Sequence, residues 1–322
     1  MGKLSKYAEL IRLNRPIGIY LLLWPCLWAL WLSSNGDPDI KVLTIFVLGV
    51  IFIRSAGCAI NDFIDRKYDV HVRRTKNRPI AAGEVKPLEA LVVFCVLSIA
   101  AFSLVIMLNN LTILLSLIGI FLIISYPFMK RLHYLPQVHL GISFAWSVPM
   151  VFAAQTGKMP TPEGWLLFVA AVLWTTVYDT MYAMADKEDD VKIGVKSTAI
   201  LFGPYDRAML ACLQTLLVIV FLFIGYRADF GAIFFSFLLI AVWLMINHQF
   251  LIIERKPMYC IDAFINNNYV GFFIFAGISL DYLAKQGIGL YKRFVNITHL
   301  KNPIKKRSCS SFTNDMENWS VI

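Results

Sequence analysis

Nine apolar runs, each long enough to cross a membrane as a helix, dominate this chain of 322 residues. A helix needs about 20 apolar residues to span the hydrocarbon core of a bilayer. Hydrophobic residues make up 58% of the chain and charged residues only 16%, whereas soluble domains are roughly half apolar and one quarter charged. The sequence therefore predicts an all-α polytopic membrane protein, with nine transmembrane helices in a bundle. The predicted spans are 17–34, 42–60, 88–108, 111–129, 138–155, 164–184, 208–226, 230–252 and 264–284.

Positive charges alternate between the gaps that separate these runs. Lys and Arg precede the first span and fill the even-numbered gaps, whereas each odd-numbered gap holds one or none. Cytoplasmic loops carry such an excess, so the alternation predicts that the N-terminus and the even gaps face the cytoplasm. The net charge of +9 follows this topology and forms no single basic face, which argues against a nucleic-acid partner.

Two segments that follow spans carry acids first and cations afterwards. The first, NDFIDRKYDVHVRRTKNRPI, runs from Asn61 to Ile80, and the second, YDTMYAMADKEDDVKIGVKS, runs from Tyr178 to Ser197. Because four spans separate them, both segments meet the same side of the membrane. This arrangement predicts two parallel four-helix repeats plus one further helix.

The acids of each segment share one face of a helix, given about 100° of rotation per residue. These two rows are Asp62, Asp65 and Asp69, then Asp179, Asp186, Asp189 and Asp190, with Tyr182 on the second face. Crowded carboxylates repel one another, and a divalent cation relieves the repulsion. Mg²⁺ takes a few carboxylates and shares substrate phosphates, to which Arg and Lys also donate. The pattern predicts a Mg²⁺ site for a diphosphate with an apolar tail. The alternative, two solvated loops with ordinary charges, is disfavoured by the matched spacing.

The two acidic motifs resemble those of the UbiA-type superfamily of membrane-embedded aromatic prenyltransferases. Within that superfamily the chain is similar to the 4-hydroxybenzoate polyprenyltransferases of bacterial ubiquinone biosynthesis. The resemblance covers residues 12–284, nearly the whole chain. The stretches that carry it are RPIGIYLLLWPCLWALW, RSAGCAINDFIDRKYDVHVRRTKNRPI, YPFMKR, LPQVHLG, YDTMYAMADKEDDVKIGVKSTAILFG and FINNNYVG.

The resemblance implies a helical bundle in the bacterial inner membrane, with the active site facing the cytoplasm. It implies polyprenyl diphosphate and 4-hydroxybenzoate as substrates, Mg²⁺ as cofactor, and 3-polyprenyl-4-hydroxybenzoate plus diphosphate as products. No obligate protein partner is expected. Carried onto this sequence, the metal-binding aspartates are Asp65, Asp69, Asp186 and Asp190. Asp62 and Asp189 lie on the same rows, and Asp189 is a candidate to accept the phenol proton.

The nearby cations are candidates to bind the diphosphate oxygens. They are Arg73, Arg74, Arg78, Lys130, Lys192 and Lys196. Positive charge at these oxygens stabilises the leaving group, and a cavity within lipid keeps water from the allylic cation. Tyr126, Tyr178 and Tyr182 are candidates to shield that cation with their ring faces, and helix packing is the alternative role for each.

Arg54 lies inside the second span, where an unpaired charge costs ~2.5–3.5 kcal/mol. We expect it to bind the carboxylate of the aromatic acceptor, with Asn61 and Arg15 as possible helpers. The alternative is an ion pair between helices, because charged side chains within membranes pair with one another.

Two domains are expected: a membrane-embedded catalytic domain over 1–286 and a polar, basic, poorly ordered tail over 287–322. Two other functions stay open. One is a prenyltransferase with another aromatic acceptor. The other is a secondary transporter of an organic anion, which predicts charges near the bilayer midplane.

Overall fold

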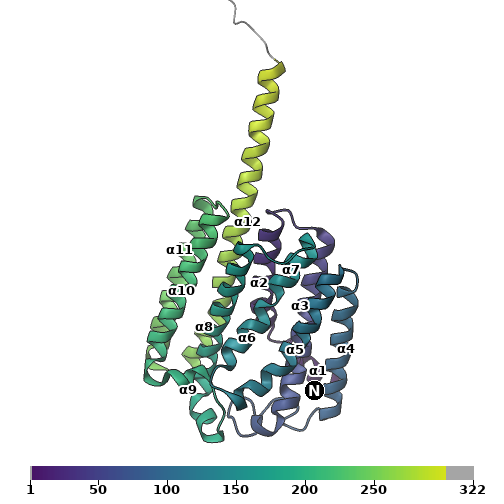
Figure 1. Ribbon diagram of the computed structural model, residues 1–322. Coiled ribbons are helices and arrows are strands. Elements are labelled where there is room, and N and C mark those ends of the chain that lie inside the picture. Colours follow the sequence, from purple (N-terminus) through teal and green to yellow (C-terminus); the bar gives the residue numbers. More distant parts are fainter. Residues whose placement is uncertain (1, 302–322) are drawn as a thin grey trace, which may run out of the picture. The chain divides into compact units, whose positions relative to one another are not determined.

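The computed structural model describes the backbone of residues 2–301 and the side chains of residues 2–287. All regular structure in that part of the chain is helical (Figure 1). The helices are α1 (Lys3–Leu10), α2 (Ile17–Ser33), α3 (Ile40–Asp69), α4 (Pro87–Val105), α5 (Asn110–Leu132), α6 (Pro136–Ala145), α7 (Ser147–Thr156), α8 (Pro162–Ile193), α9 (Thr198–Phe202), η1 (Gly203–Tyr205), α10 (Asp206–Arg227), α11 (Ala232–Leu251), η2 (Ile252–Glu254) and α12 (Pro257–Lys301).

Every predicted span coincides with helix in the structure. Over the described residues, eight segments are long and apolar enough to cross a membrane, and the first predicted span is α2, an apolar helix of 17 residues. The fifth span consists of α6 and α7, which follow one another with only Trp146 between them. The prediction of an all-helical membrane bundle is therefore confirmed, and the chain is an integral membrane protein.

Side-chain caps explain where several helices begin. Asp39 accepts a hydrogen bond from the Val42 backbone N–H at 2.9 Å at the start of α3. Asn109 caps α5 and Thr161 caps α8 in the same way. Each cap satisfies a backbone N–H that helix geometry leaves without an intrahelical partner. An Asp, Asn or Thr side chain therefore fixes the start of each of these helices.

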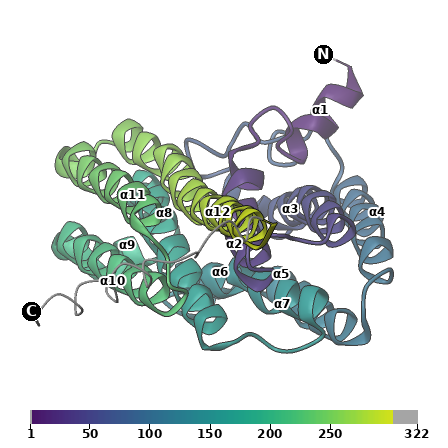
Figure 2. The same ribbon diagram turned by 90° about the horizontal axis from the view of Figure 1, so that it is seen from above.

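The helix order follows the predicted plan of two sets of four plus one. The first set is α2 to α5, the second consists of α6 with α7, α8, α10 and α11, and α12 follows. Helices α3 and α8, with 30 and 32 residues, hold the second position in each set and carry the acidic rows at their C-terminal ends. Figure 2 shows α3 and α4 on one side of the bundle and α10 and α11 on the other, and α2 packs against both α3 and α8.

Tryptophans from α2 and α8 fill the centre of the bundle. Trp28 and Trp174 are fully buried, and their ring centroids lie 5.1 Å apart. A buried indole N–H needs an acceptor, which Asn267 provides for Trp174 at 3.2 Å and the Gly271 carbonyl for Trp28 at 3.1 Å. A Cβ at Gly271 would overlap Trp24, so glycine permits this close approach. The FINNNYVG stretch thus serves helix packing.

The chain divides into two compact units at Tyr282 and Leu283, within α12. The first unit holds all the helices before α12 together with the first turns of α12. In the second unit the backbone of α12 is helical as far as Lys301. The predicted domain boundary at 286 falls inside this helix, and residues 302–322 of the predicted tail lie outside the described residues.

Candidate active site

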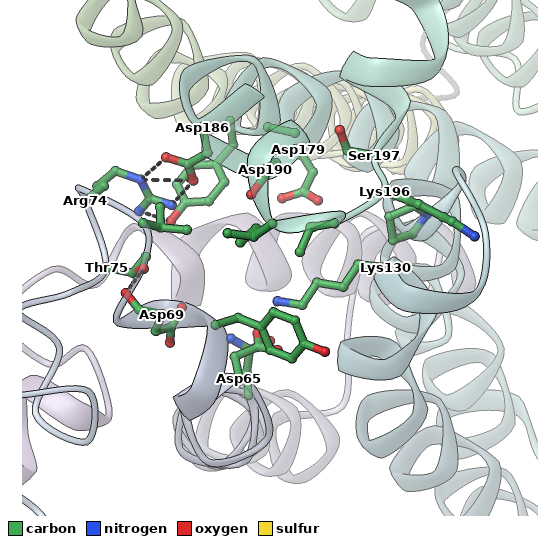
Figure 3. A pocket seen from close by; sticks show the side chains of 18 of the residues that line it. Asp65, Asp69, Arg74, Thr75, Lys130, Asp179, Asp186, Asp190, Lys196 and Ser197 are labelled. Carbon is green, nitrogen blue, oxygen red and sulfur yellow. Dashed lines mark hydrogen bonds and ion pairs between the residues drawn. The ribbon is translucent and has the colours of Figure 1, made fainter. Parts of the chain in front are cut away.

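A polar cavity of about 120 Å³ lies where the C-terminal ends of α3 and α8 face each other (Figure 3). Its walls also include the end of α5, the start of α6 and the connections that follow α3 and α8. Five carboxylates line it: Asp65, Asp69, Asp179, Asp186 and Asp190. The four aspartates predicted to bind metal therefore share one cavity, with two contributed by each acidic row.

The first acidic row is buried and bound by cations. Asp65 is 1% exposed and accepts ion pairs from Lys130 and, at 3.2 Å, from Arg131, both at the end of α5. Lys130 lines the cavity, whereas Arg131 does not. The KR pair of the YPFMKR stretch thus neutralises the middle aspartate of the row.

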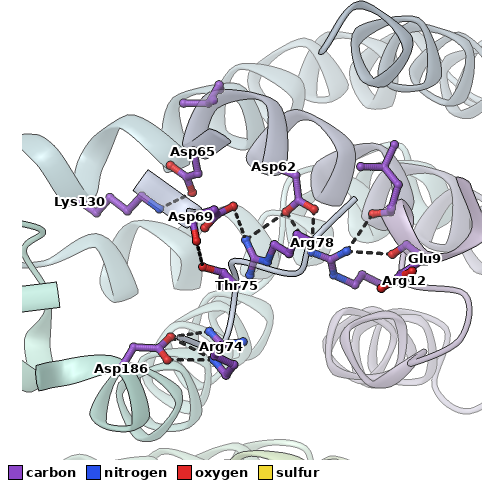
Figure 4. Close-up of polar contacts among 12 residues, drawn as sticks. Glu9, Arg12, Asp62, Asp65, Asp69, Arg74, Thr75, Arg78, Lys130 and Asp186 are labelled. Atoms are coloured by element: carbon purple, nitrogen blue, oxygen red, sulfur yellow. Dashed lines mark hydrogen bonds and ion pairs between the residues drawn. The ribbon is translucent and has the colours of Figure 1, made fainter. Parts of the chain in front are cut away.

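Asp62 belongs to this row but does not line the cavity. Both of its oxygens accept hydrogen bonds from Arg12, at 2.9 and 2.8 Å, and Arg78 lies 3.1 Å away (Figure 4). Arg78 also binds Asp69 at 3.0 Å, so one guanidinium bridges two members of the row. Burial alone lowers the pKa of Arg78, but the carboxylates of Asp62 and Asp69 outweigh this effect, and the pKa is raised.

The second acidic row is held more loosely. Arg74 reaches from the connection between α3 and α4 to Asp186, with Nε 2.9 and 3.2 Å from its two oxygens. The same guanidinium donates to the Tyr182 hydroxyl and lies 4.2 Å from the Tyr182 ring centroid. Asp190 and Asp179 line the cavity, and neither has an ion pair among the described residues. Part of the negative charge of this row is therefore not neutralised by a cation.

Asp189 faces out of the cavity. Its oxygens accept the Arg73 backbone N–H at 3.2 Å and lie 3.5 Å from Lys192. Arg73 and Lys192 also lie outside the cavity, and their side chains are 75% and 62% exposed. These three predicted site residues therefore form a surface cluster beside the cavity.

No three Asp, Glu, His or Cys side chains of the described part of the chain converge closely enough to hold an ion as they stand. The oxygens of Asp65, Asp69 and Asp186 are bound by Lys and Arg instead. The donor set nevertheless fits a hard divalent cation, because all of its members supply carboxylate oxygens to one cavity.

Arg54 lies deeper in α3, outside the cavity lining. Its guanidinium packs so closely over Gly18 of α2 that a Cβ there would be 2.6 Å from Nη2. Nη1 donates to the Cys58 sulfur at 2.9 Å, whereas the buried Nε has no hydrogen-bond partner. Cys58, Tyr178 and Asp179 interact with it electrostatically, but no carboxylate lies within ion-pair distance in the described residues. No interhelical ion pair to Arg54 is therefore formed among the described residues, and its role toward the acceptor stays a prediction.

The other predicted site residues divide between the cavity and its surroundings. Asn61, Tyr182 and Lys196 line the cavity, and Lys196 also donates to the Leu132 carbonyl at 3.1 Å. Tyr178 packs in the core against Trp174, with ring centroids 5.1 Å apart, and its buried hydroxyl has no hydrogen-bond partner.

Sequence reasoning did not assign site roles to Arg12 and Arg131, which bind the first acidic row, or to Gln137 and Asp179, which line the cavity. Asp179 was recognisable, because it lies on the acidic face of α8 and the structure places it in the cavity. Arg12, by contrast, is 50 residues from Asp62, and no sequence pattern links the two.

Fold and site together define a helical integral membrane protein with a cavity of facing carboxylates and cations at one end of its bundle. The sequence profile of the UbiA prenyltransferase family matches residues 22–276. The chain belongs to this family.

Relatives of similar length agree with this assignment. A protein of Coxiella burnetii named 4-hydroxybenzoate octaprenyltransferase is 53% identical over 280 residues, which cover 87% of this chain and 97% of the relative. A protein of the same name from Saccharophagus degradans is 55% identical, covering 87% of this chain and 93% of the relative.

Solved structures share the fold. A UbiA homologue from Aeropyrum pernix K1 superposes with a TM-score of 0.72 at 28% identity, covering 82% of this chain and 97% of that one. A UbiA homologue from Archaeoglobus fulgidus, bound to GPP and Mg²⁺, has a TM-score of 0.64 at 20% identity and covers 85% of this chain and 99% of that one. At that identity the likeness concerns the fold alone.

Proposed function

We propose that this protein transfers a polyprenyl group from polyprenyl diphosphate to C3 of 4-hydroxybenzoate, giving 3-polyprenyl-4-hydroxybenzoate and diphosphate. The observation that carries the proposal is the single cavity in which carboxylates of α3 and α8 alternate with Arg and Lys. Relatives named for this reaction are more than half identical over most of their length, which supports the choice of acceptor. The reaction takes place at the cytoplasmic face of a bacterial inner membrane, as the alternation of positive charge favours.

The aspartates Asp65, Asp69, Asp186 and Asp190 would hold Mg²⁺. When bound, the metal supplies positive charge that stabilises the departing diphosphate. A homologue of the same fold bound to GPP and Mg²⁺ supports this choice of ion. The cavity of about 120 Å³ is smaller than the ~300–1,000 Å³ of common ligand pockets. We therefore expect the cations that now bind these carboxylates to turn toward the substrate when it enters.

Arg74, Arg78 and Lys130 then donate to diphosphate oxygens. Charge on these oxygens grows as the bond between carbon and oxygen breaks, so fixed donors stabilise the transition state more than the ground state. Lys196 lines the same cavity and is a further donor. Burial alone lowers the pKa of Arg74. The interactions with Tyr182 and Asp186 raise it by more, so the pKa lies above its ordinary value. It therefore remains cationic throughout.

The acceptor lies on the Arg54 side of the cavity. Arg54 is a buried cation whose Nε has no hydrogen-bond partner among the described residues, and Tyr178 of α8 interacts with it electrostatically. A carboxylate accepts hydrogen bonds from a guanidinium, and a buried charge demands such compensation. This arrangement favours aromatic acceptors that carry an acid group over neutral ones.

The ring carbon next to the phenol oxygen attacks the allylic carbon while the bond from that carbon to the diphosphate oxygen breaks. The ring proton then passes to the released diphosphate, which restores the aromatic ring. Asp179 is better placed than Asp189 to accept the phenol proton. It lines the cavity, interacts electrostatically with Arg54 and has no ion pair to any described residue, whereas Asp189 lies outside the cavity and accepts the Arg73 backbone N–H.

The proposal is tested in membranes that carry the protein. Geranyl diphosphate and 4-hydroxybenzoate are supplied with Mg²⁺ or with excess EDTA, and the prenylated acid is detected by mass spectrometry. We expect product only with Mg²⁺, none from Asp65→Ala or Asp186→Ala, and undiminished product from Asp37→Ala, an exposed acid at the opposite end of the bundle. Absence of product with both geranyl and long-chain donors, in folded protein, would contradict the assigned acceptor.

A further inference from the structure

A second buried charge cluster lies behind the second acidic row, outside the cavity. Its centre is Asp206, the first residue of α10, whose side chain is 0% exposed. Arg255 donates Nε to both oxygens of Asp206 at 3.0 Å and Nη2 to one of them at 2.7 Å. The Lys187 ammonium lies 3.4 Å from the other oxygen.

The two cations also fix the backbone just before Asp206. Lys187 donates to the Gly203 carbonyl at 2.9 Å, and Arg255 donates to the Pro204 carbonyl at 2.9 Å. Arg255 has a φ of 52°, in the left-handed region that side chains other than glycine rarely adopt. Such a backbone persists only where its surroundings hold it in place. The cluster thus joins the end of α8, the corner before α10 and the corner before α12.

Lys187 connects this cluster to the acidic row, because it follows Asp186 directly in α8. At about 100° per residue, Lys187 points roughly a right angle away from the face that presents Asp186 and Asp190. The rotation of α8 about its own axis therefore sets both directions at once. When Lys187 points to Asp206, Asp186 and Asp190 point to the cavity. We propose that Asp206 is a positioning residue, which holds Lys187 and so keeps Asp186 and Asp190 turned toward the cavity. The inference rests on the metal site of the proposed function.

The ion pair between Lys187 and Asp206 matters because few other contacts hold the second row in place. Arg74 is the cation that binds Asp186, its side chain is 34% exposed, and Asp190 has no ion pair within the described residues. The first row, in contrast, is buried among four cations. Partners that orient metal ligands without touching the metal typically change metal affinity by roughly 10- to 100-fold when they are removed.

The test measures metal binding without catalysis. Free Mn²⁺ is followed by electron paramagnetic resonance during titration of the purified protein in detergent, with Mg²⁺ as competitor and Asp186→Ala as the variant that defines the site. We expect Asp206→Asn to weaken Mn²⁺ binding by roughly tenfold. Lys187→Met should weaken it in the same direction, and Lys187→Arg should retain it. Because Lys187 is partly exposed, its variants remain informative if Asp206→Asn does not fold.

The control is Glu163→Gln, at the opposite end of the same helix. Glu163 binds Arg227 at 2.7 Å, so this variant also removes an ion pair between α8 and α10. We expect its Mn²⁺ affinity to equal that of the unmodified protein. Unchanged affinity in folded Lys187→Met and Asp206→Asn, or an equal loss in Glu163→Gln, overturns the positioning role. Absence of any binding that depends on Asp186 overturns the proposed metal site and this inference with it.

Discussion

The two acidic rows face the same cavity, but they are neutralised to different degrees. The first row lies on α3, is almost fully buried, and binds Arg12, Arg78, Lys130 and Arg131. The second row lies on α8, and of its cavity-lining members only Asp186 has an ion pair among the described residues. Each buried carboxylate of the first row has a cation as its counterion, and these ion pairs hold the row in place. The second row retains free carboxylate oxygens for a ligand.

The sources of the cations extend this contrast. Those of the first row come from the segment before α2, the end of α5 and the connection between α3 and α4. Those of the second row are Arg73 and Arg74 from that connection, together with Lys192 from α8 itself. This connection therefore touches both rows, and its movement would change the second row more than the first. We infer that the carboxylates of the first row keep their positions when substrate binds, whereas those of the second row move to accommodate it.

The largest expected effect separates activity from stability. Asp65→Asn and Asp186→Asn should each lower the rate by about 10²-fold or more, since each removes a proposed metal ligand worth several kcal/mol. Only Asp65→Asn should also unfold at a clearly lower temperature, because it leaves Lys130 and Arg131 without their buried partner, at a cost of ~3–5 kcal/mol. Product formation and thermal unfolding in detergent measure the two effects. Equal stability losses in both variants would contradict the contrast between the rows.

The helices were predictable because lipid leaves the backbone few choices. Each apolar run had to form a helix, and two of these runs directly follow residues that cap helices well, Asp39 and Asn109. The rows were predictable because helical periodicity brings acids onto one face. The same periodicity was too coarse to separate Asp189 from Asp190, of which only Asp190 lines the cavity.

The ion pairs were not predictable, since they join segments that are distant in sequence. Arg74 and Asp186 are 112 residues apart, and Lys130 and Asp65 are 65 apart. Which cation meets which carboxylate depends on the packing of α3, α5 and α8, and no local pattern encodes that packing. Counting charges between spans identified the cations as a group but not their individual partners.

Arg54 is the exception on α3, because this buried cation has no carboxylate within ion-pair distance among the described residues. Arg54→Gln should raise the KM for 4-hydroxybenzoate by roughly 10- to 100-fold, as expected when a charge-assisted hydrogen bond worth ~1.5–3 kcal/mol is lost. The KM for the prenyl diphosphate should stay the same, because Arg54 lies outside the cavity. Steady-state kinetics with each substrate varied in turn distinguish these outcomes. An equal rise in both constants would show that Arg54 supports the fold and does not bind the acceptor.

Substitution of Arg12 tests whether a cation outside the cavity helps to hold the first row in place. Arg12→Gln removes one of two cations on Asp62, while Arg78 keeps its bonds to Asp62 and Asp69. We expect a rise of roughly three- to tenfold in the KM for the prenyl diphosphate, because Arg78 is oriented less firmly. Arg15→Gln, three residues further on and exposed, should leave this constant unchanged. A similar change in both variants would point to a general effect of charge before α2.

The smallest effect is expected at Lys192, on the open side of the second row. Lys192 was a candidate for the diphosphate, but it lies outside the cavity, is 62% exposed and pairs with Asp189 at 3.5 Å. Exposed ion pairs contribute ~0–1 kcal/mol, so Lys192→Gln should change the KM for the prenyl diphosphate by less than about threefold. Lys130→Gln, which removes a cavity-lining cation from the first row, should raise it far more. A loss at Lys192 as large as that at Lys130 would mean that the end of α8 closes onto the bound diphosphate. In that case the second row would adapt by a larger movement than the turning of single side chains.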